Sequence, residues 1–408
     1  MAEVSLAVSA GVLVTPLREH SPGVVLIRGE HILAVGDASE IAIPEGVQRI
    51  DASRGLVGPG FVDTHVHGRE GHYFGESEEI TLQLCRSILS SGTTSLLPTV
   101  GAQPTLEGLL QQMEAIHLAM QRKHLGAQIL GLHAEGPYFS DQPVARGSQP
   151  AAMFRKPSIE ELHRMMRASG SSLRLMSLAP ELDGALELIN ELVKLGVVVS
   201  AGHSAATFEQ AMAGVRAGLS CATHTFNGML PFHHRKPGLL GAVLTSHEIR
   251  AELIADGEHV SPPAMRLLVQ MKGVDGVHLV TDNTMYAGLP DGTYEDPKRD
   301  RAVRKEGNRA YVVGGTLAGS VAPMSTCVGN LVTEVGCSIV DAVRMATLNP
   351  AKLIHADDLR GSLEPGKLAD LVALDDQFEV EWTMVRGRIG YSRGTLSQGN
   401  SGGSRTAH

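Results

Sequence analysis

Apolar residues follow two different patterns in this chain, one in the middle and one at both ends. Across the middle, short apolar runs alternate with stretches in which apolar residues return every three or four positions. The runs predict eight strands, at about residues 60–65, 93–100, 127–134, 173–179, 196–202, 220–225, 249–255 and 277–281. The stretches between them, for example 184–193 and 208–217, predict helices. Eight strand-and-helix units in succession predict a TIM-type (β/α)8 barrel over residues 58–356.

The two ends of the chain carry shorter β-rich runs separated by turns. Such runs lie at 11–14, 24–27 and 31–35, and similar ones return at 370–374 and 381–385. Because short hairpins are marginally stable alone, we expect the two ends to pair. The sequence therefore predicts a small β-sandwich domain built from residues 1–57 and 357–394, followed by a disordered Gly- and Ser-rich tail at 395–408.

Two insertions interrupt the repeating pattern of the barrel. The unit after the third strand carries four prolines between residues 137 and 157, which predicts a large loop over the barrel mouth. A glycine-rich stretch at about 285–314 predicts a hairpin or flap.

Composition narrows the class of protein and of partner. The net charge of −9 argues against a general binder of nucleic acid, although a few local cations could still hold a small anionic substrate. The four cysteines are widely spaced, which favours a reduced, cytoplasmic protein with buried thiols. The N-terminus lacks the pattern of a signal peptide, and no run reaches the roughly 18 apolar residues of a membrane span. We therefore expect neither membrane nor nucleic acid as a partner.

Histidines and acids stand where the predicted strands end. His65 and His67 close the first run, and their spacing puts both imidazoles on the same face of an extended chain. Single residues of metal-binding type close later runs: Glu135, His203, His224 and Asp282. Because the carboxyl ends of barrel strands meet at one mouth, these residues together predict a hydrolytic metal centre. Imidazole and carboxylate ligands favour one or two zinc ions, with iron, manganese or cobalt as alternatives.

Asp282 is the predicted catalytic residue, as well as a ligand. Beside a divalent ion its pKa should fall, so it would start as a carboxylate and act first as general base and then as general acid. His259 and Arg235 are candidates for binding an anion, because an Arg fork suits phosphate. The alternative interpretation of the charged run at 233–236 is a solvated loop. His133 could either line the pocket or pack below it.

The motifs around these residues resemble the amidohydrolase superfamily, and most closely its N-acetylglucosamine-6-phosphate deacetylases. The resemblance covers almost the whole chain. It rests on PGFVDTHVHG at 59–68, HAEGP at 133–137, AGHS at 201–204, THTFNGM at 223–229, IADGEH at 254–259, TD at 281–282, AGLPDG at 287–292, LAGS at 317–320, NPA at 349–351 and GSLEPGKLADLV at 361–372.

The resemblance implies a metal site of Glu135, His203 and His224, with Asp282 as catalytic acid and base. It implies deacetylation of N-acetylglucosamine 6-phosphate in amino sugar catabolism. It also implies a set of contacts to sugar and phosphate, from Asn227, Gly228, Arg235, His259 and Leu317. In this family the phosphate-binding Arg can come from a neighbouring subunit, which implies a homodimer.

The chain departs from the family pattern at three places. It has both His65 and His67, which some members lack, so a second metal ion is expected. Gln149 stands where the family usually has His, and Asn283 follows Asp282 where Ala is commoner. The last two bear on sugar specificity. Three alternatives remain: an amidohydrolase of another N-acyl amino sugar (a galacto epimer or an unphosphorylated sugar), one of a cyclic amide, and a non-catalytic scaffold on the same barrel.

Overall fold

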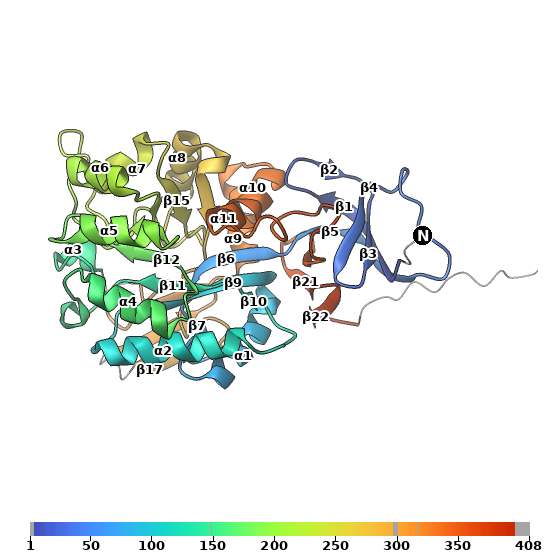
Figure 1. Cartoon of the computed structure of the whole chain (residues 1–408). Coiled ribbons are helices and arrows are strands. Elements are labelled where there is room, and N and C mark those ends of the chain that lie inside the picture. Colours follow the sequence, from blue (N-terminus) through green and yellow to red (C-terminus); the bar gives the residue numbers. More distant parts are fainter. Residues whose placement is uncertain (1–3, 148, 297–300, 316, 396–408) are drawn as a thin grey trace, which may run out of the picture.

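The computed structural model describes residues 4–147, 149–296, 301–315 and 317–395, and it divides into a barrel and a smaller sheet beside it (Figure 1). The barrel strands run parallel to their neighbours. They are β6 (Phe61–Val66), β9 (Thr93–Gly101), β10 (Gln128–Ile129), β11 (Leu132–Glu135), β12 (Leu173–Leu178), β13 (Val198–Ala201), β14 (Cys221–Ala222), β15 (Arg250–Leu253) and β16 (Val277–Leu279). These strands confirm the predicted barrel.

Backbone bonds between the first and last strands nearly close the barrel. After β16 the chain runs beside β6, where the Asp282 N–H donates to the carbonyl of His65 at 2.8 Å and the His67 N–H donates to Asn283 at 2.8 Å. These two bonds join the segment that carries the first predicted ligands to the segment that carries the predicted catalytic acid. Closure therefore fixes part of the candidate site.

Helices cover the outside of the barrel because their apolar residues lie on one face. In α5 (Ala185–Lys194) the buried residues are Ala185, Leu188, Ile189 and Leu192, which is helical spacing. The other barrel helices are α1 (Glu78–Ser87), α2 (Leu106–Met120), α4 (Ile159–Ala168), α6 (Phe208–Ala217), α7 (Gly238–Thr245), α8 (Pro262–Lys272), α9 (Met324–Asn330), α10 (Ile339–Ala346) and α11 (Leu348–Leu353). Among the described residues, no helix combines the length and the apolar character needed to cross a membrane.

The small sheet joins both ends of the chain, as predicted. Its strands are β1 (Leu6–Val14), β2 (Glu19–His20), β3 (Gly23–Arg28), β4 (His31–Asp37), β5 (Gln48–Pro59), β20 (Leu371–Leu374), β21 (Val380–Val385) and β22 (Arg388–Ser392). The two ends meet where β20 pairs antiparallel with β5, and Trp382 lies buried in the core of the sheet. Apart from Thr395, the predicted tail lies outside the described residues.

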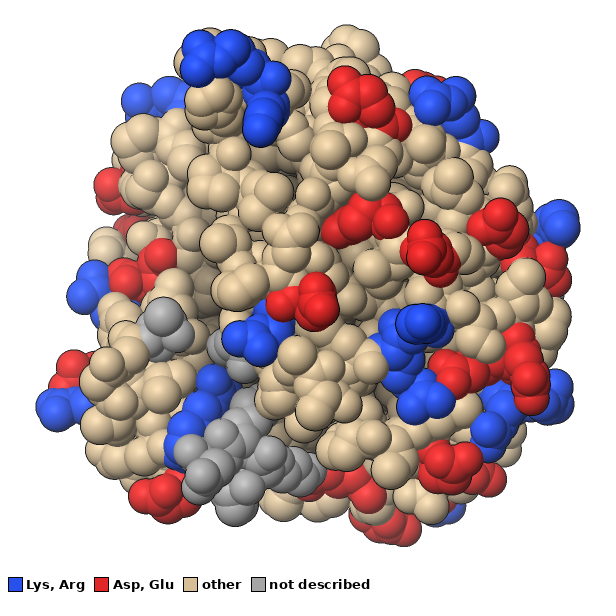
Figure 2. All heavy atoms as spheres, turned by 90° about the vertical axis from the view of Figure 1, so that its left-hand side faces the viewer, with Lys and Arg blue, Asp and Glu red and all other residues tan. Residues whose placement is uncertain are grey.

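The small sheet and the barrel mouth lie at opposite ends of the molecule (Figure 1). The short helix α3 (Pro143–Arg146) and the turn Ala151–Met153 belong to the proline-rich insertion at the mouth. The second insertion is a three-stranded antiparallel flap of β17 (Gly292–Asp296), β18 (Arg301–Glu306) and β19 (Arg309–Val312). On the face that carries the mouth, acidic and basic side chains are interspersed (Figure 2).

Candidate metal centre and active site

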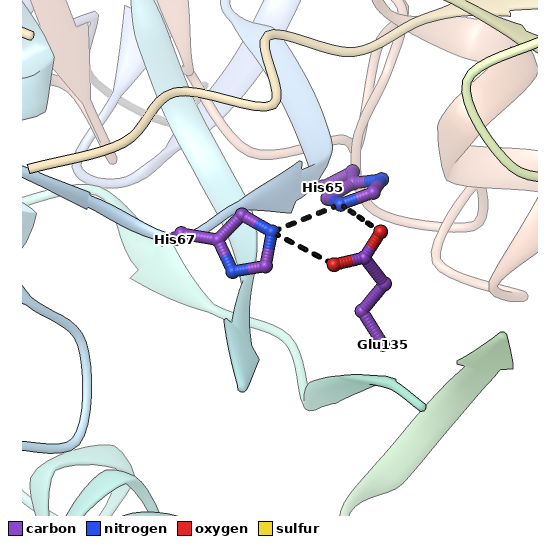
Figure 3. Close-up of side chains that lie close together, drawn as sticks. All are labelled: His65, His67 and Glu135. Atoms are coloured by element: carbon purple, nitrogen blue, oxygen red, sulfur yellow. Dashed lines mark hydrogen bonds and ion pairs between the residues drawn. The ribbon is translucent and has the colours of Figure 1, made fainter. Parts of the chain in front are cut away.

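Five side chains from the carboxyl ends of barrel strands converge around a sixth, Glu135. In the first group, Glu135 Oε1 lies 3.1 Å from Nε2 of both His203 and His224, and these two nitrogens are 3.1 Å apart. In the second group, Nε2 of His65 and His67 are 3.2 Å apart. Glu135 Oε2 lies 3.2 Å from His67 Nε2, so one carboxylate touches both groups (Figure 3).

Asp282 completes the second group. Its Oδ1 lies 3.3 Å from His65 Nε2 and 3.2 Å from His67 Nε2. Its side chain is 17% exposed, against 3% for Glu135, so Asp282 is the more accessible of the two carboxylates that line the cavity. The structure thus brings together all six residues that the sequence nominated as ligands, from strand ends that are far apart in the chain.

Three of these residues adopt a backbone conformation that L-residues rarely take. The φ angles of His203, His224 and Asp282 are +47°, +30° and +50°. Positive φ at non-glycine residues is costly and persists where surrounding structure enforces it. Here each residue lies two or three positions after the end of its strand, and the turn aims the side chain at the shared centre instead of continuing the ladder.

The histidines are oriented as metal ligands usually are. Nδ1 of His65 lies 3.1 Å from Glu252 Oε2. Nδ1 of His203 and of His224 lies 2.9 and 3.1 Å from the carbonyl oxygens of Ala145 and Asn227. Acceptors at Nδ1 require the proton there, which leaves the Nε2 lone pair facing the centre. The Nε2 atoms of His203 and His224, which are 3.1 Å apart, then need a cation between them. The residues of both groups therefore fit a divalent ion.

The carboxylates of the centre remain charged despite their burial. Burial works to raise the pKa of Glu135, but its close contacts with His203, His224 and His67 outweigh it and hold the pKa well below its usual range. For Asp282, burial is likewise outweighed, mainly by His65 and then by His67, and the pKa is lowered. The negative charge of these two carboxylates favours the binding of a cation at the centre.

The centre opens into a cavity of about 910 Å³. The predicted substrate contacts Asn227, Gly228, His259 and Leu317 line it, together with His67, Glu135, His203, His224 and Asp282. Gly228 has φ +59°, and a Cβ there would come within 2.9 Å of His203 Nδ1. The backbone can therefore lie this close to His203 only because residue 228 has no side chain.

Arg235 does not line this cavity. It is exposed, and its Nη1 donates to His234 Nε2 at 2.8 Å. Among the described lining residues, Arg301 of β18 is the one Lys or Arg, and its Nε donates to Asp296 at 3.2 Å. Sequence reasoning missed Arg301, because the flap gave no sign of which way its side chains point.

His259 is held on the cavity wall by Asp256. Its Nδ1 lies 2.7 Å from Asp256 Oδ2, while Oδ1 of the same acid accepts the backbone N–H of Glu258 and of His259. Burial lowers the pKa of His259, but the bond to Asp256 and the charge of that acid outweigh the effect, so the pKa is raised. The arrangement favours a cationic imidazole facing the cavity.

Gln149 and His133 differ in their position relative to the cavity, as their contacts show. Gln149, from the proline-rich insertion, lines the cavity and donates through Nε2 to Glu135 Oε2 at 3.4 Å. His133 is fully buried and uses both ring nitrogens, at 3.2 Å from Thr99 Oγ1 and 2.8 Å from Ser177 Oγ. Burial lowers its pKa to about 3. His133 therefore packs below the centre.

Comparisons with known proteins place these observations in a family. Residues 56–390 match the model of the amidohydrolase family. The chain is 37% identical to an N-acetylgalactosamine-6-phosphate deacetylase of Escherichia coli O157:H7, over 88% of this chain and 94% of the relative. It is 36% identical to the human N-acetylglucosamine-6-phosphate deacetylase, over 84% of this chain and 85% of that protein.

Solved structures agree with the sequence comparisons. A mutant of N-acetyl-D-glucosamine-6-phosphate deacetylase from Mycobacterium smegmatis, in complex with N-acetyl-D-glucosamine-6-phosphate, superposes with a TM-score of 0.87 at 31% identity, over 96% of this chain and all of that one. The Pasteurella multocida N-acetylglucosamine-6-phosphate deacetylase gives 0.86 at 33% identity, over 94% of this chain and 99% of that one. The chain therefore belongs to the amidohydrolase family, on the branch that contains these amino sugar 6-phosphate deacetylases.

Proposed function

We propose that this chain is a metal-dependent hydrolase that converts N-acetylglucosamine 6-phosphate and water into glucosamine 6-phosphate and acetate. The observation that carries the proposal is the position of Asp282, whose Oδ1 lies 3.2–3.3 Å from two histidine nitrogens of the centre and whose side chain lines the cavity. A protonatable group there can reach both an attacking water and a leaving amine. The likeness to deacetylases over most of the chain supports the choice of bond.

Two sets of residues would hold divalent ions. The first set is Glu135 with His203 and His224. The second set is His65 with His67 and Asp282, and Glu135 lies beside it. A bound ion would supply a Lewis acid that polarises the acetyl carbonyl and lowers the pKa of water. Because histidine and carboxylate donors suit it, we propose zinc, with iron, manganese or cobalt as alternatives.

Asp282 performs the proton transfers in this proposal. Its lowered pKa makes it a carboxylate at neutral pH, so it accepts a proton from the attacking water. It then donates that proton to the amide nitrogen as the C–N bond breaks, which releases the amine and acetate. The carboxylate returns to its starting state after one turnover.

The cavity lining beside the centre would hold the sugar phosphate. A cationic His259 donates to a phosphate oxygen, Asn227 and the Gly228 backbone bind polar groups of the sugar, and Leu317 packs on the ring. Since Arg235 is exposed and does not line the cavity of its own chain, we propose that it serves the cavity of a second subunit in a homodimer. A cytoplasmic location agrees with four cysteines that form no disulfide among themselves.

A galacto epimer is the second candidate substrate, because a relative at 37% identity carries the name N-acetylgalactosamine-6-phosphate deacetylase. The two epimers differ at one hydroxyl, and Gln149 and Asn283 depart from the commoner family residues near the centre. We therefore include both epimers in the test.

Acetate release tests the function directly. The enzyme is supplied with zinc and given the two N-acetylhexosamine 6-phosphates and unphosphorylated N-acetylglucosamine. We expect rapid release from a phosphorylated sugar and a kcat/KM lower by about tenfold or more without the phosphate, since a charged hydrogen bond is lost. Asp282→Asn should lower kcat by roughly 10²–10⁴-fold. Equal kcat/KM with and without phosphate, or near-normal turnover in the variant, would contradict the proposal.

A further inference from the structure

A buried acid that the proposed mechanism does not use lies directly below the centre. Glu252 belongs to β15 and its side chain has no exposed surface. Its Oε2 lies 3.1 Å from His65 Nδ1 and accepts the backbone N–H of His224 at 3.0 Å. A single oxygen atom thus contacts one ligand from each of the two metal-binding groups.

The remaining contacts of Glu252 do not account for its burial. A buried carboxylate is costly unless it is well paired. Oε1 faces His278 Nε2 at 3.8 Å and has no hydrogen-bond partner among the described residues. Oε2 is therefore the oxygen that has hydrogen bonds, and its bonds to His65 and His224 offset the free-energy cost of burying the acid.

We propose that Glu252 is a positioning residue that decides whether the His65–His67 group holds a divalent ion. The inference rests on the metal dependence proposed above. By accepting the Nδ1 proton, Glu252 keeps Nε2 of His65 free and aimed at His67 and Asp282. A carboxylate at Nδ1 also makes the imidazole a stronger ligand. The bond to the His224 backbone ties the same oxygen to the other group.

Glu252 also belongs to a third group of metal-type side chains, with Cys221 and His278, whose ligand atoms lie within 4.8 Å of one another. One observation argues against a separate ion there. Burial raises the pKa of the Cys221 thiol and keeps it protonated, whereas a thiol binds metal as the thiolate. This group therefore supports the centre above it.

The test counts metal ions per chain in four proteins: the wild type, Glu252→Leu, Glu252→Gln and Cys221→Ser. Each is loaded with zinc and dialysed against a graded series of concentrations of a weak chelator. Metal content by mass spectrometry then gives the number of ions and their affinities, with circular dichroism as a check on folding. Leu has a similar size but no acceptor. Gln can present an amide oxygen to the same two N–H groups. Cys221→Ser changes the same buried group without touching the bond to His65.

We expect two ions in the wild type and in Cys221→Ser, and one ion in Glu252→Leu. Glu252→Gln should keep two, the second bound roughly 10–100-fold more weakly. A wild type with one ion, or unchanged affinity for both ions in either Glu252 variant, would overturn the proposal. So would loss of the same ion in Cys221→Ser. If Glu252→Leu does not fold, the affinities of Glu252→Gln decide. Failure of acetate release with two ions bound would reject the substrate and leave this proposal standing.

Discussion

At the scale of single residues, carboxylates set the charge and direction of the histidines around the cavity. Asp256 fixes one nitrogen of His259, and Glu252 fixes one nitrogen of His65. In both pairs the acid is more deeply buried than a lone charge tolerates, so the imidazole and the acid stabilise each other. The chemistry of the site therefore depends on residues that do not themselves face the substrate.

Asp256→Asn should shift the pH dependence of substrate binding. The pKa of His259 is raised, so its positive charge is present at low pH and is lost as pH rises through that pKa. Without the acid, burial acts unopposed and the pKa falls. KM for the phosphorylated sugar should then begin to rise at a lower pH than in the wild type, by about tenfold or more once the charge is gone.

Steady-state kinetics across pH, with the unphosphorylated sugar as control substrate, check this expectation. Only the phosphorylated sugar should show the shifted KM, because only it uses the charge. The same shift with both sugars would mean that Asp256 acts on the structure of the cavity and not on phosphate binding.

Residue types at strand ends made the cluster of candidate ligands predictable, whereas the residues that support the cluster were not predictable. Each nominated ligand is a His, Asp or Glu that follows an apolar run, so pattern and chemistry agree locally. Glu252 stands inside such a run, where a lone acid signals burial but not its partner, and its bond to His65 spans 187 positions. Arg235 has a guanidinium group that suits phosphate, but no feature of the neighbouring sequence indicated that it would not line the cavity of its own chain.

At the scale of elements, an N-cap at the start of α6 stabilises the loop that carries His203. Thr207 caps α6 four residues after His203, and the cap is reciprocal: Thr207 Oγ1 accepts the Gln210 N–H at 3.2 Å, and Gln210 Oε1 accepts the Thr207 N–H at 2.9 Å. The loop from β13 to α6 is short, so the cap also limits how far His203 can move.

Thr207→Ala should lower the free energy of unfolding by about 0.5–2 kcal/mol, the usual contribution of such a cap. The expected fall in Tm, by scanning calorimetry, is roughly 1 °C for each kcal/mol in a chain of 408 residues. Thr207→Ser keeps the hydroxyl and should stay near the wild type. A Ser variant as unstable as the Ala variant would show that the methyl group, and not the cap, stabilises this region.

Strand positions were predictable because parallel strands with both faces buried appear as unbroken apolar runs. Strand ends were less so. The sixth strand was expected at 220–225, but β14 covers only Cys221–Ala222. The chain leaves the ladder early because His224, with φ +30°, turns toward the centre. The turn at His224 therefore ends this strand earlier than its apolar run predicts.

At the scale of the whole molecule, the proposed site extends over two subunits. Each cavity would contain Asp282 of its own chain and Arg235 of its partner. Arg235 lies in an exposed segment at 231–236 that also carries Phe232, an apolar side chain that is 54% exposed. Such a segment is suited to lie against another copy of the chain.

A mixed dimer of Asp282→Asn and Arg235→Ala subunits should recover activity that neither variant shows alone. In the mixed dimer one cavity has both an intact Asp282 and an intact Arg235 from the partner. Co-expression with two affinity tags isolates that species, and acetate release at low substrate concentration measures it. Activity no higher than that of the Arg235→Ala homodimer would place Arg235 outside the neighbouring cavity.

The pairing of β5 with β20 also sets an order of events during synthesis. Residues 48–59 leave the ribosome more than three hundred positions before residues 371–374, which form their antiparallel neighbour. Until then β1, β3, β4 and β5 expose an unpaired edge, the kind of surface on which chains associate wrongly. The last strands to emerge cover that edge. A nascent chain that stalls late, with its barrel already translated, would therefore be marked for the quality-control machinery by an incomplete sheet at the end opposite its active site.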